Sequence, residues 1–131
     1  MECEPVTERF LPSVLYYVDA LMKLPHAEQA VVDVRKLRDY CLNDEHPRGQ
    51  HKARVFKSAL GWTAVQAEEM RRRLLEAALH EDASFLGADD YGQRYALDFA
   101  VQDAGGVVTV RSLWIVRPGE DFPRFTSCYV L

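Results

Sequence analysis

The most constraining feature of the sequence is a strict alternation of side chains between residues 92 and 102. Every second residue from 95 to 101 is apolar, and the residues between them are small or charged; the apolar positions are Tyr95, Leu97, Phe99 and Val101. A period of two residues is typical of a β-strand with one buried face. Residues 103–106, Asp-Ala-Gly-Gly, follow as a turn, so the C-terminal third is expected to fold as antiparallel hairpins.

The turns also predict the register of this sheet. Residues 107–117 are expected to form a second strand, residues 118–121 a second turn and residues 122–131 a third strand. Tight turns would place Gln102 opposite Val107 and Arg117 opposite Phe122. One face then becomes the expected core face, with Tyr95, Leu97, Phe99, Val101, Val108, Val110, Trp114, Val116, Phe125 and Tyr129.

The other face of the sheet is expected to be open. In this register Arg111 lies opposite Asp98, a cross-strand pair worth roughly 0.2–1 kcal/mol. Arginines on one small face could hold a phosphate or a carboxylate, since a guanidinium binds such groups with two hydrogen bonds. A solvated face with one ion pair is the alternative. The residues expected here are Arg94, Asp98, Thr109, Arg111, Arg117, Arg124 and Thr126, mixed with Leu113, Ile115 and Cys128.

Helical spacing of apolar residues precedes the sheet. It predicts helices over residues 33–42, 50–60 and 64–81, followed by an acidic loop over residues 81–90. Asp33 is the expected N-cap of the first helix, Gly61 ends the second, and Thr63 with Gln66 forms a capping box for the third. The predicted fold class is α+β, a single domain over residues 22–131 with N-terminal helices packed on one face of a C-terminal antiparallel meander sheet.

Residues 1–21 are expected to be an N-terminal extension. Residues 8–24 have the pattern of an amphipathic helix with Pro12 in its first turn, and a loosely attached extension is the alternative. The acidic start is unlike a signal peptide, and the apolar run is too short to span a bilayer. The three cysteines lack disulfide or metal spacing. These observations predict a cytoplasmic protein with free thiols and no membrane contact.

The densest functional chemistry lies in residues 46–52, His-Pro-Arg-Gly-Gln-His-Lys. A histidine such as His46 can act as a general base or acid, and Lys52 can stabilise a developing negative charge. Free N–H groups at the start of the following helix favour anions. The alternative is a structural turn in which His46 caps a backbone group and Lys52 is solvated. The histidines and cysteines lack zinc-ligand spacing, so no metal is expected.

Several segments resemble a bacterial domain-of-unknown-function family. They are residues 36–43, the HPxGxxKAxxF element at 46–56, and residues 60–61, 91–95, 111–115 and 123–129. Members of that family occur as small stand-alone proteins and as C-terminal tips of polymorphic toxins. The resemblance covers about residues 22–131, which leaves residues 1–21 outside the family.

The toxin context and the order of helices before sheet are similar to the barnase–EndoU–colicin–RelE class of small metal-independent ribonucleases. This resemblance implies a site on the open sheet face, with no cofactor, and a small cognate antitoxin or immunity-type protein as partner. Carried onto this chain, the implied roles are His46 as general base or acid, Lys52 and Arg111 as stabilisers of the transition state, Thr126 as a hydrogen-bond donor, Arg94 and Arg124 as RNA-backbone contacts, and His51 as a loose candidate for the second acid–base residue.

Two other functions stay open from the sequence. A non-catalytic protein-interaction module of a two-gene toxin–antitoxin-like pair is favoured by the net charge of −4, because nucleases that act on RNA tend to be basic. An enzyme acting on a small anionic metabolite or nucleotide is the third.

Overall fold

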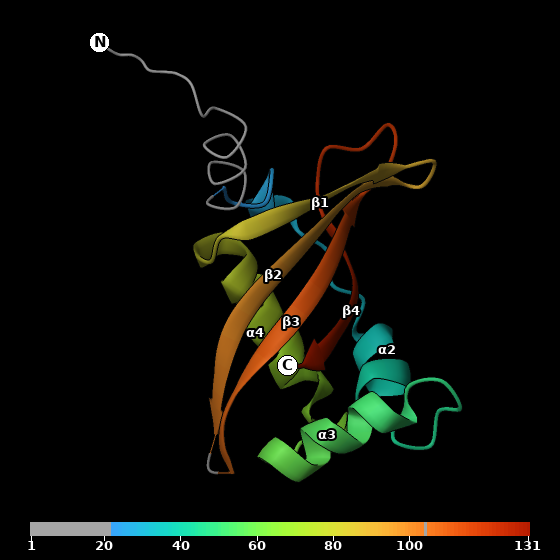
Figure 1. The fold of residues 1–131 in the computed structure, drawn as a ribbon, viewed down its shortest axis with the longest axis vertical. Coiled ribbons are helices and arrows are strands. Elements are labelled where there is room, and N and C mark those ends of the chain that lie inside the picture. The colour runs from blue at the N-terminus through green and yellow to red at the C-terminus, as the bar shows by residue number, and fades with distance from the viewer. Residues whose placement is uncertain (1–21, 104) are drawn as a thin grey trace, which may run out of the picture.

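The computed structural model describes residues 22–103 and 105–131. Helical segments come first and the sheet last (Figure 1), so the α+β fold class is confirmed. The extension expected at residues 1–21 lies outside the described residues, and residues 22–24 are not helical. The elements are η1 (Ala27–Gln29), α2 (Val34–Lys36), η2 (Leu37–Cys41), α3 (Gln50–Leu60), η3 (Ala64–Gln66), α4 (Ala67–His80), β1 (Ala83–Asp89), β2 (Gly92–Asp103), β3 (Gly106–Val116) and β4 (Arg124–Val130).

The described residues form a four-stranded antiparallel meander in the order β1-β2-β3-β4. Helix α4 lies behind β2 and β3 in Figure 1, and α3 lies across the end of the sheet where β4 finishes. The buried core includes Trp114, Phe125, Phe56 and Leu74, each at most 1% exposed. The expected core face of β2 and β3 is therefore confirmed.

The predicted caps are present in the structure. The Asp33 carboxylate accepts a hydrogen bond from the Arg35 amide at 3.0 Å. Gly61 ends α3 with a φ of 73°, a left-handed conformation that glycine adopts without strain. Thr63 and Gln66 form the capping box that leads through η3 into α4. The first helix differs from expectation, because one α turn passes into the π turn η2, in which the Leu42 amide donates to the Leu37 carbonyl at 2.9 Å.

The prediction of an acidic loop over residues 81–90 is wrong, because most of this segment forms strand β1. Ala83 is 2% exposed in the core, and the Phe85 ring lies edge-on to Tyr95 with 5.5 Å between ring centroids. A bulge between Phe85 and Gly87 then shifts the register against β2. A short edge strand with a bulge and acids at both ends lacks the alternation that identifies a strand in sequence.

The register between β2 and β3 is as predicted, with Asp98 opposite Arg111. Between β3 and β4 the predicted pairs Ile115 with Arg124 and Trp114 with Phe125 are present. The predicted pair of Arg117 with Phe122 is wrong, because β3 ends at Val116 and β4 begins only at Arg124. Leu113 then pairs with Ser127, so Thr126 is an extra residue in β4. Its hydroxyl donates to the Leu113 carbonyl at 3.0 Å, which stabilises this bulge.

The bulge reverses the predicted facing of the end of β4. A one-residue shift moves every later side chain to the opposite face of a strand. Cys128, expected on the open face, lies opposite Ser112 and is 1% exposed in the core. Tyr129, expected in the core, lies opposite Arg111 on the open face.

Candidate functional site

The open face of the sheet is arranged in cross-strand rows. Asp98, Arg111 and Tyr129 form the row nearest α3; Ala96, Leu113 and Ser127 form the middle row; Arg94, Ile115 and Arg124 form the far row. The outer rows are four β3 positions apart, about 13 Å at the usual rise of a strand. Polar groups therefore lie at the two ends of this face, with apolar and small residues between them.

The near row meets the first turn of α3. The Lys52 ammonium lies over the Tyr129 ring, with Nζ 4.6 Å from the ring centroid. Arg111 donates two hydrogen bonds to the Asp98 carboxylate, at 2.8 Å and 2.9 Å. These bonds, and a weaker one with Tyr129, raise the pKa of Arg111 above its usual value. An ammonium and a guanidinium thus both lie beside the Tyr129 phenol, and we call these three residues the Lys52–Tyr129–Arg111 cluster.

A hollow of about 310 Å³ adjoins this cluster. The residues that line it come from β1 and the residue before it, from β2 and from β3: Asp82, Ser84, Leu86, Ala96, Asp98 and Arg111. This volume is at the lower end of the range for small-molecule sites. The cluster therefore borders a space that can accept part of a ligand.

The His46 ring is part of the turn before α3. Its Nδ1 accepts hydrogen bonds from the amides of Arg48 at 3.0 Å and Gly49 at 3.2 Å. The ring also lies edge-on to Tyr40, with centroids 4.7 Å apart. The capping alternative is confirmed. Because Nδ1 accepts these bonds, the hydrogen-bond pattern assigns the ring proton to Nε2, which then donates rather than accepts.

The other residues of the 46–56 motif are either packed in the core or exposed at the surface. A Cβ on Gly49 would lie 2.7 Å from the Tyr40 carbonyl oxygen, so this close approach requires glycine. Ala53 and Phe56 are buried at 1% and 0% exposure. His51 is exposed, and Lys52 reaches Tyr129. Most residues of the motif therefore stabilise α3 and the turn before it, and Lys52 is the motif residue that lies in the cluster.

We expect His46→Ala to lower the free energy of unfolding by about 1 kcal/mol, as the loss of an N-terminal cap does. Urea denaturation measures the change. His51→Ala, in the first turn of α3 with an exposed ring, is the matched control and should stay within about 0.5 kcal/mol of the parent protein. Equal stability of the two variants would contradict the capping role of His46.

The other predicted site residues are already engaged. Arg94 donates to Asp89 at 2.9 Å, and Arg124 donates two bonds to Glu120, each at 2.9 Å. These arginines lower the pKa of Asp89 and of Glu120. Exposed pairs of this kind contribute about 0–1 kcal/mol, so a phosphate can replace the carboxylate. The Thr126 hydroxyl, in contrast, is committed to the bulge.

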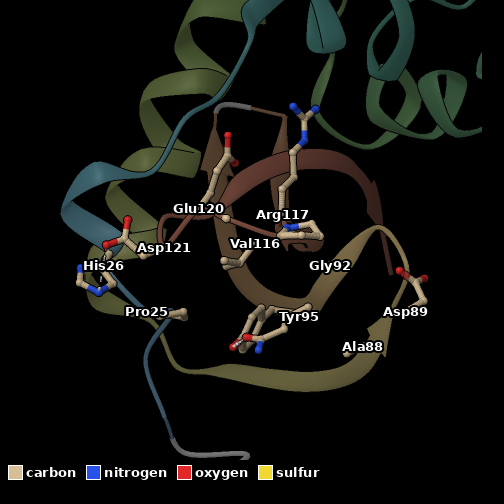
Figure 2. A pocket seen from close by; sticks show the side chains of 13 residues that line it. Pro25, His26, Ala88, Asp89, Gly92, Tyr95, Val116, Arg117, Glu120 and Asp121 are labelled. Atoms are coloured by element: carbon tan, nitrogen blue, oxygen red, sulfur yellow. Dashed lines mark hydrogen bonds and ion pairs between the residues drawn. The ribbon is translucent and has the colours of Figure 1, made fainter.

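A larger hollow of about 510 Å³ lies at the opposite end of the sheet (Figure 2). In Figure 2, Tyr95 lies between Pro25 and Ala88, and His26 and Asp121 lie together at one side, with His26 Nε2 3.9 Å from Asp121 Oδ2. Asp89 lies at the other side. None of the residues given a role in the reaction lines this hollow, although Arg117, which was expected on the open face, does. Segments that are far apart in the sequence form this hollow, so no local sequence motif predicts it.

Two further findings concern only residues 22–103 and 105–131. Within these ranges, no group of three or more His, Cys, Asp or Glu side chains is placed to hold a metal ion. None of the helices there combines the length and the apolar character needed to cross a membrane.

Comparison with known proteins gives one family. A family model described as a domain of unknown function, DUF6883, matches residues 23–131. The match covers most of the chain and coincides with the region expected for the family from the sequence motifs. No curated protein matches the chain. The description of the family assigns no activity, so a functional conclusion depends on the geometry of the site.

Proposed function

The chain belongs to the DUF6883 family, and from its open sheet face we propose that it is a toxin-like endoribonuclease that needs no metal ion. The observation that carries this proposal is the Lys52–Tyr129–Arg111 cluster. Attack of a ribose 2′-hydroxyl on the adjacent phosphate places negative charge on the phosphate oxygens and requires a proton for the leaving oxygen. Two cations beside one phenol hydroxyl supply both needs.

Each member of the cluster has a role in this reaction. Lys52 and Arg111 stabilise the charge on the phosphorane-like transition state, and the Tyr129 hydroxyl protonates the 5′-oxygen as its bond to phosphorus breaks. The bond from the 2′-oxygen to phosphorus forms in the same step and leaves a 2′,3′-cyclic phosphate. His51, with its exposed ring, takes the 2′-hydroxyl proton. His46 can do so only after releasing the amides of the turn.

Thr126 is a positioning residue in this proposal. Its hydrogen bond to Leu113 stabilises the bulge that turns Tyr129 outward. Arg94 and Arg124 occupy the far row of the open face, about 13 Å from Arg111 along β3. They are placed to bind the RNA backbone beyond the scissile phosphate, in exchange for their present carboxylate partners.

The local charge around α3 also supports RNA binding. Residues 35–57 hold seven Lys and Arg against three Asp and Glu. This basic region contrasts with the net charge of −4 for the whole chain. A local positive potential is what attracts a polyanion, whatever the mean charge.

The test is incubation of the purified full chain with total RNA in the presence of a chelator. We expect fragments that end in a 2′,3′-cyclic phosphate and start with a 5′-hydroxyl, and expression of the active chain in a bacterial host should arrest growth. RNA that stays intact at high protein concentration, together with normal growth, would refute the proposal.

A non-catalytic interaction module is the second candidate. The observation that favours it is the hollow of Figure 2, beside which a mainly apolar hollow of about 420 Å³ shares Pro25 and Tyr95. Phe85 and Met22 line this second hollow and are 47% and 54% exposed. A small antitoxin or immunity-type protein would bury them. Co-purification with the product of the adjacent gene, lost in Phe85→Ala, combined with intact RNA, would favour this candidate.

A further inference from the structure

Two buried cysteines lie outside the proposed chemistry. Cys41 ends the π turn η2, and Cys128 lies on β4, turned inward by the bulge at Thr126. Each is 1% exposed and has a free thiol. The two residues are far apart in sequence, yet η2 packs against the edge strand and both cysteines belong to the same buried core cluster. Cys41 Sγ lies 3.9 Å from the hydroxyl oxygen of Ser127, the residue next to Cys128.

The surroundings of the two sulfurs differ. The Cys41 pKa is lowered to about 7, mainly by a hydrogen bond from Cys128 and also by Ser127, whose Oγ is 3.9 Å from Cys41 Sγ, and by the charge of Lys52. The Cys128 pKa is raised by the interaction with Cys41 and by burial. Cys41 is thus the more acidic of the two thiols, and Cys128 is the neighbouring thiol with which it can form a disulfide.

We propose that Cys41 and Cys128 form a reversible disulfide, a redox modification site that joins the π turn η2 to the edge strand β4. The oxidant class is a hydroperoxide. With hydrogen peroxide as the simplest member of this class, the Cys41 thiolate attacks one peroxide oxygen, the O–O bond breaks, and hydroxide leaves to be protonated to water. The Cys128 sulfur then displaces the hydroxyl of the Cys41 sulfenic acid as a second water. Two thiols lose two electrons and two protons in all.

The site lies directly behind the Lys52–Tyr129–Arg111 cluster. Tyr129 follows Cys128 in β4, and Lys52 contributes to the electrostatics of Cys41. A disulfide would therefore fix the strand that presents Tyr129. Any change in RNA cleavage on oxidation rests on the proposed function, whereas formation of the disulfide does not.

The experiment uses the full chain with Cys3→Ser, which leaves only the two buried thiols. Hydrogen peroxide is added under native conditions, and free thiols are then counted in denaturant. We expect loss of both thiols, a mass lower by two hydrogen atoms and a tryptic product that links residues 39–48 to residues 125–131, all reversed by a dithiol reductant. Cys41→Ser in the same background is the matched control and should give no intramolecular link.

Two results would overturn the proposal. One is retention of both thiols by the native chain under conditions that oxidise the same chain in denaturant. The other is conversion of Cys41 to a sulfinic acid while Cys128 stays reduced. Since the readouts are thiol count, mass and peptide linkage, they do not depend on whether the chain cleaves RNA.

Discussion

Tyr129→Phe is expected to lower the rate of metal-free RNA cleavage by about 10²–10³-fold, the usual loss when a positioned proton donor is removed. The substitution deletes a single oxygen. The ring stays beneath the Lys52 ammonium, and the strand register that places it opposite Arg111 is unchanged. The measurement is kcat/KM for a short labelled oligoribonucleotide in chelator, with thermal melting to show that the fold is intact.

Tyr91→Phe is the matched control for this experiment. The Tyr91 side chain is 72% exposed at the tip of the β1–β2 hairpin, and its backbone amide donates to the Asp89 carboxylate at 2.8 Å. Loss of the Tyr91 hydroxyl should leave kcat/KM for RNA cleavage unchanged. Full activity in Tyr129→Phe would show that the phenol is not the proton donor, and loss of activity in Tyr91→Phe would show that the assay responds to changes outside the cluster.

The fold class was predictable because its signals are local. The alternation in residues 92–102 and the turn after it are enough to place Asp98 opposite Arg111, since a tight hairpin leaves one register. The caps at Asp33 and Thr63 are equally local, because each depends on side chains within three residues. Elements specified by neighbours in the sequence appear in the structure where the pattern predicts them.

Tyr129 could not be identified from the sequence as a member of the site. Thr126 is an ordinary strand residue by type, and nothing in residues 124–130 signals a bulge. The bulge depends on how β4 meets β3 and η2, which is a property of the whole fold. One extra residue exchanges Tyr129 and Cys128 between the faces, and this exchange creates both the cluster and the buried cysteine pair.

His46 and Lys52 show that one motif can supply both a residue that caps a turn and a residue that reaches the sheet surface. The sequence places both in the turn-and-helix segment, and the resemblance implies that Lys52 works with Arg111. The structure brings Lys52 and Arg111 to the same phenol ring. It also commits His46 Nδ1 to backbone amides. A histidine beside proline and glycine can cap a turn or do acid–base chemistry, and only the geometry distinguishes them.

Gly92→Ala is expected to cause a large loss of stability, about 4 kcal/mol of the 5–15 kcal/mol typical of a domain. Gly92 has a φ of 133°, a conformation that strains other residues by about 1–3 kcal/mol. A Cβ there would also overlap the Val116 carbonyl oxygen and lie 3.0 Å from the Arg117 Cα. Because both contacts are backbone atoms, relief requires moving β3, which adds about 1–3 kcal/mol.

Gly87→Ala separates these two costs. Gly87 lies in the same hairpin with a φ of 121°, and among the described residues nothing lies within 4 Å of its Cβ position. It should therefore lose only the conformational part, about 1–3 kcal/mol. Urea denaturation followed by tryptophan fluorescence measures both variants, since Trp62 and Trp114 are buried at 2% and 1% exposure. Equal losses of unfolding free energy in Gly92→Ala and Gly87→Ala would mean that β2 does not approach the end of β3 closely at Gly92. In that case Gly92 and Val116, which both line the hollow of Figure 2, would not be in close contact there.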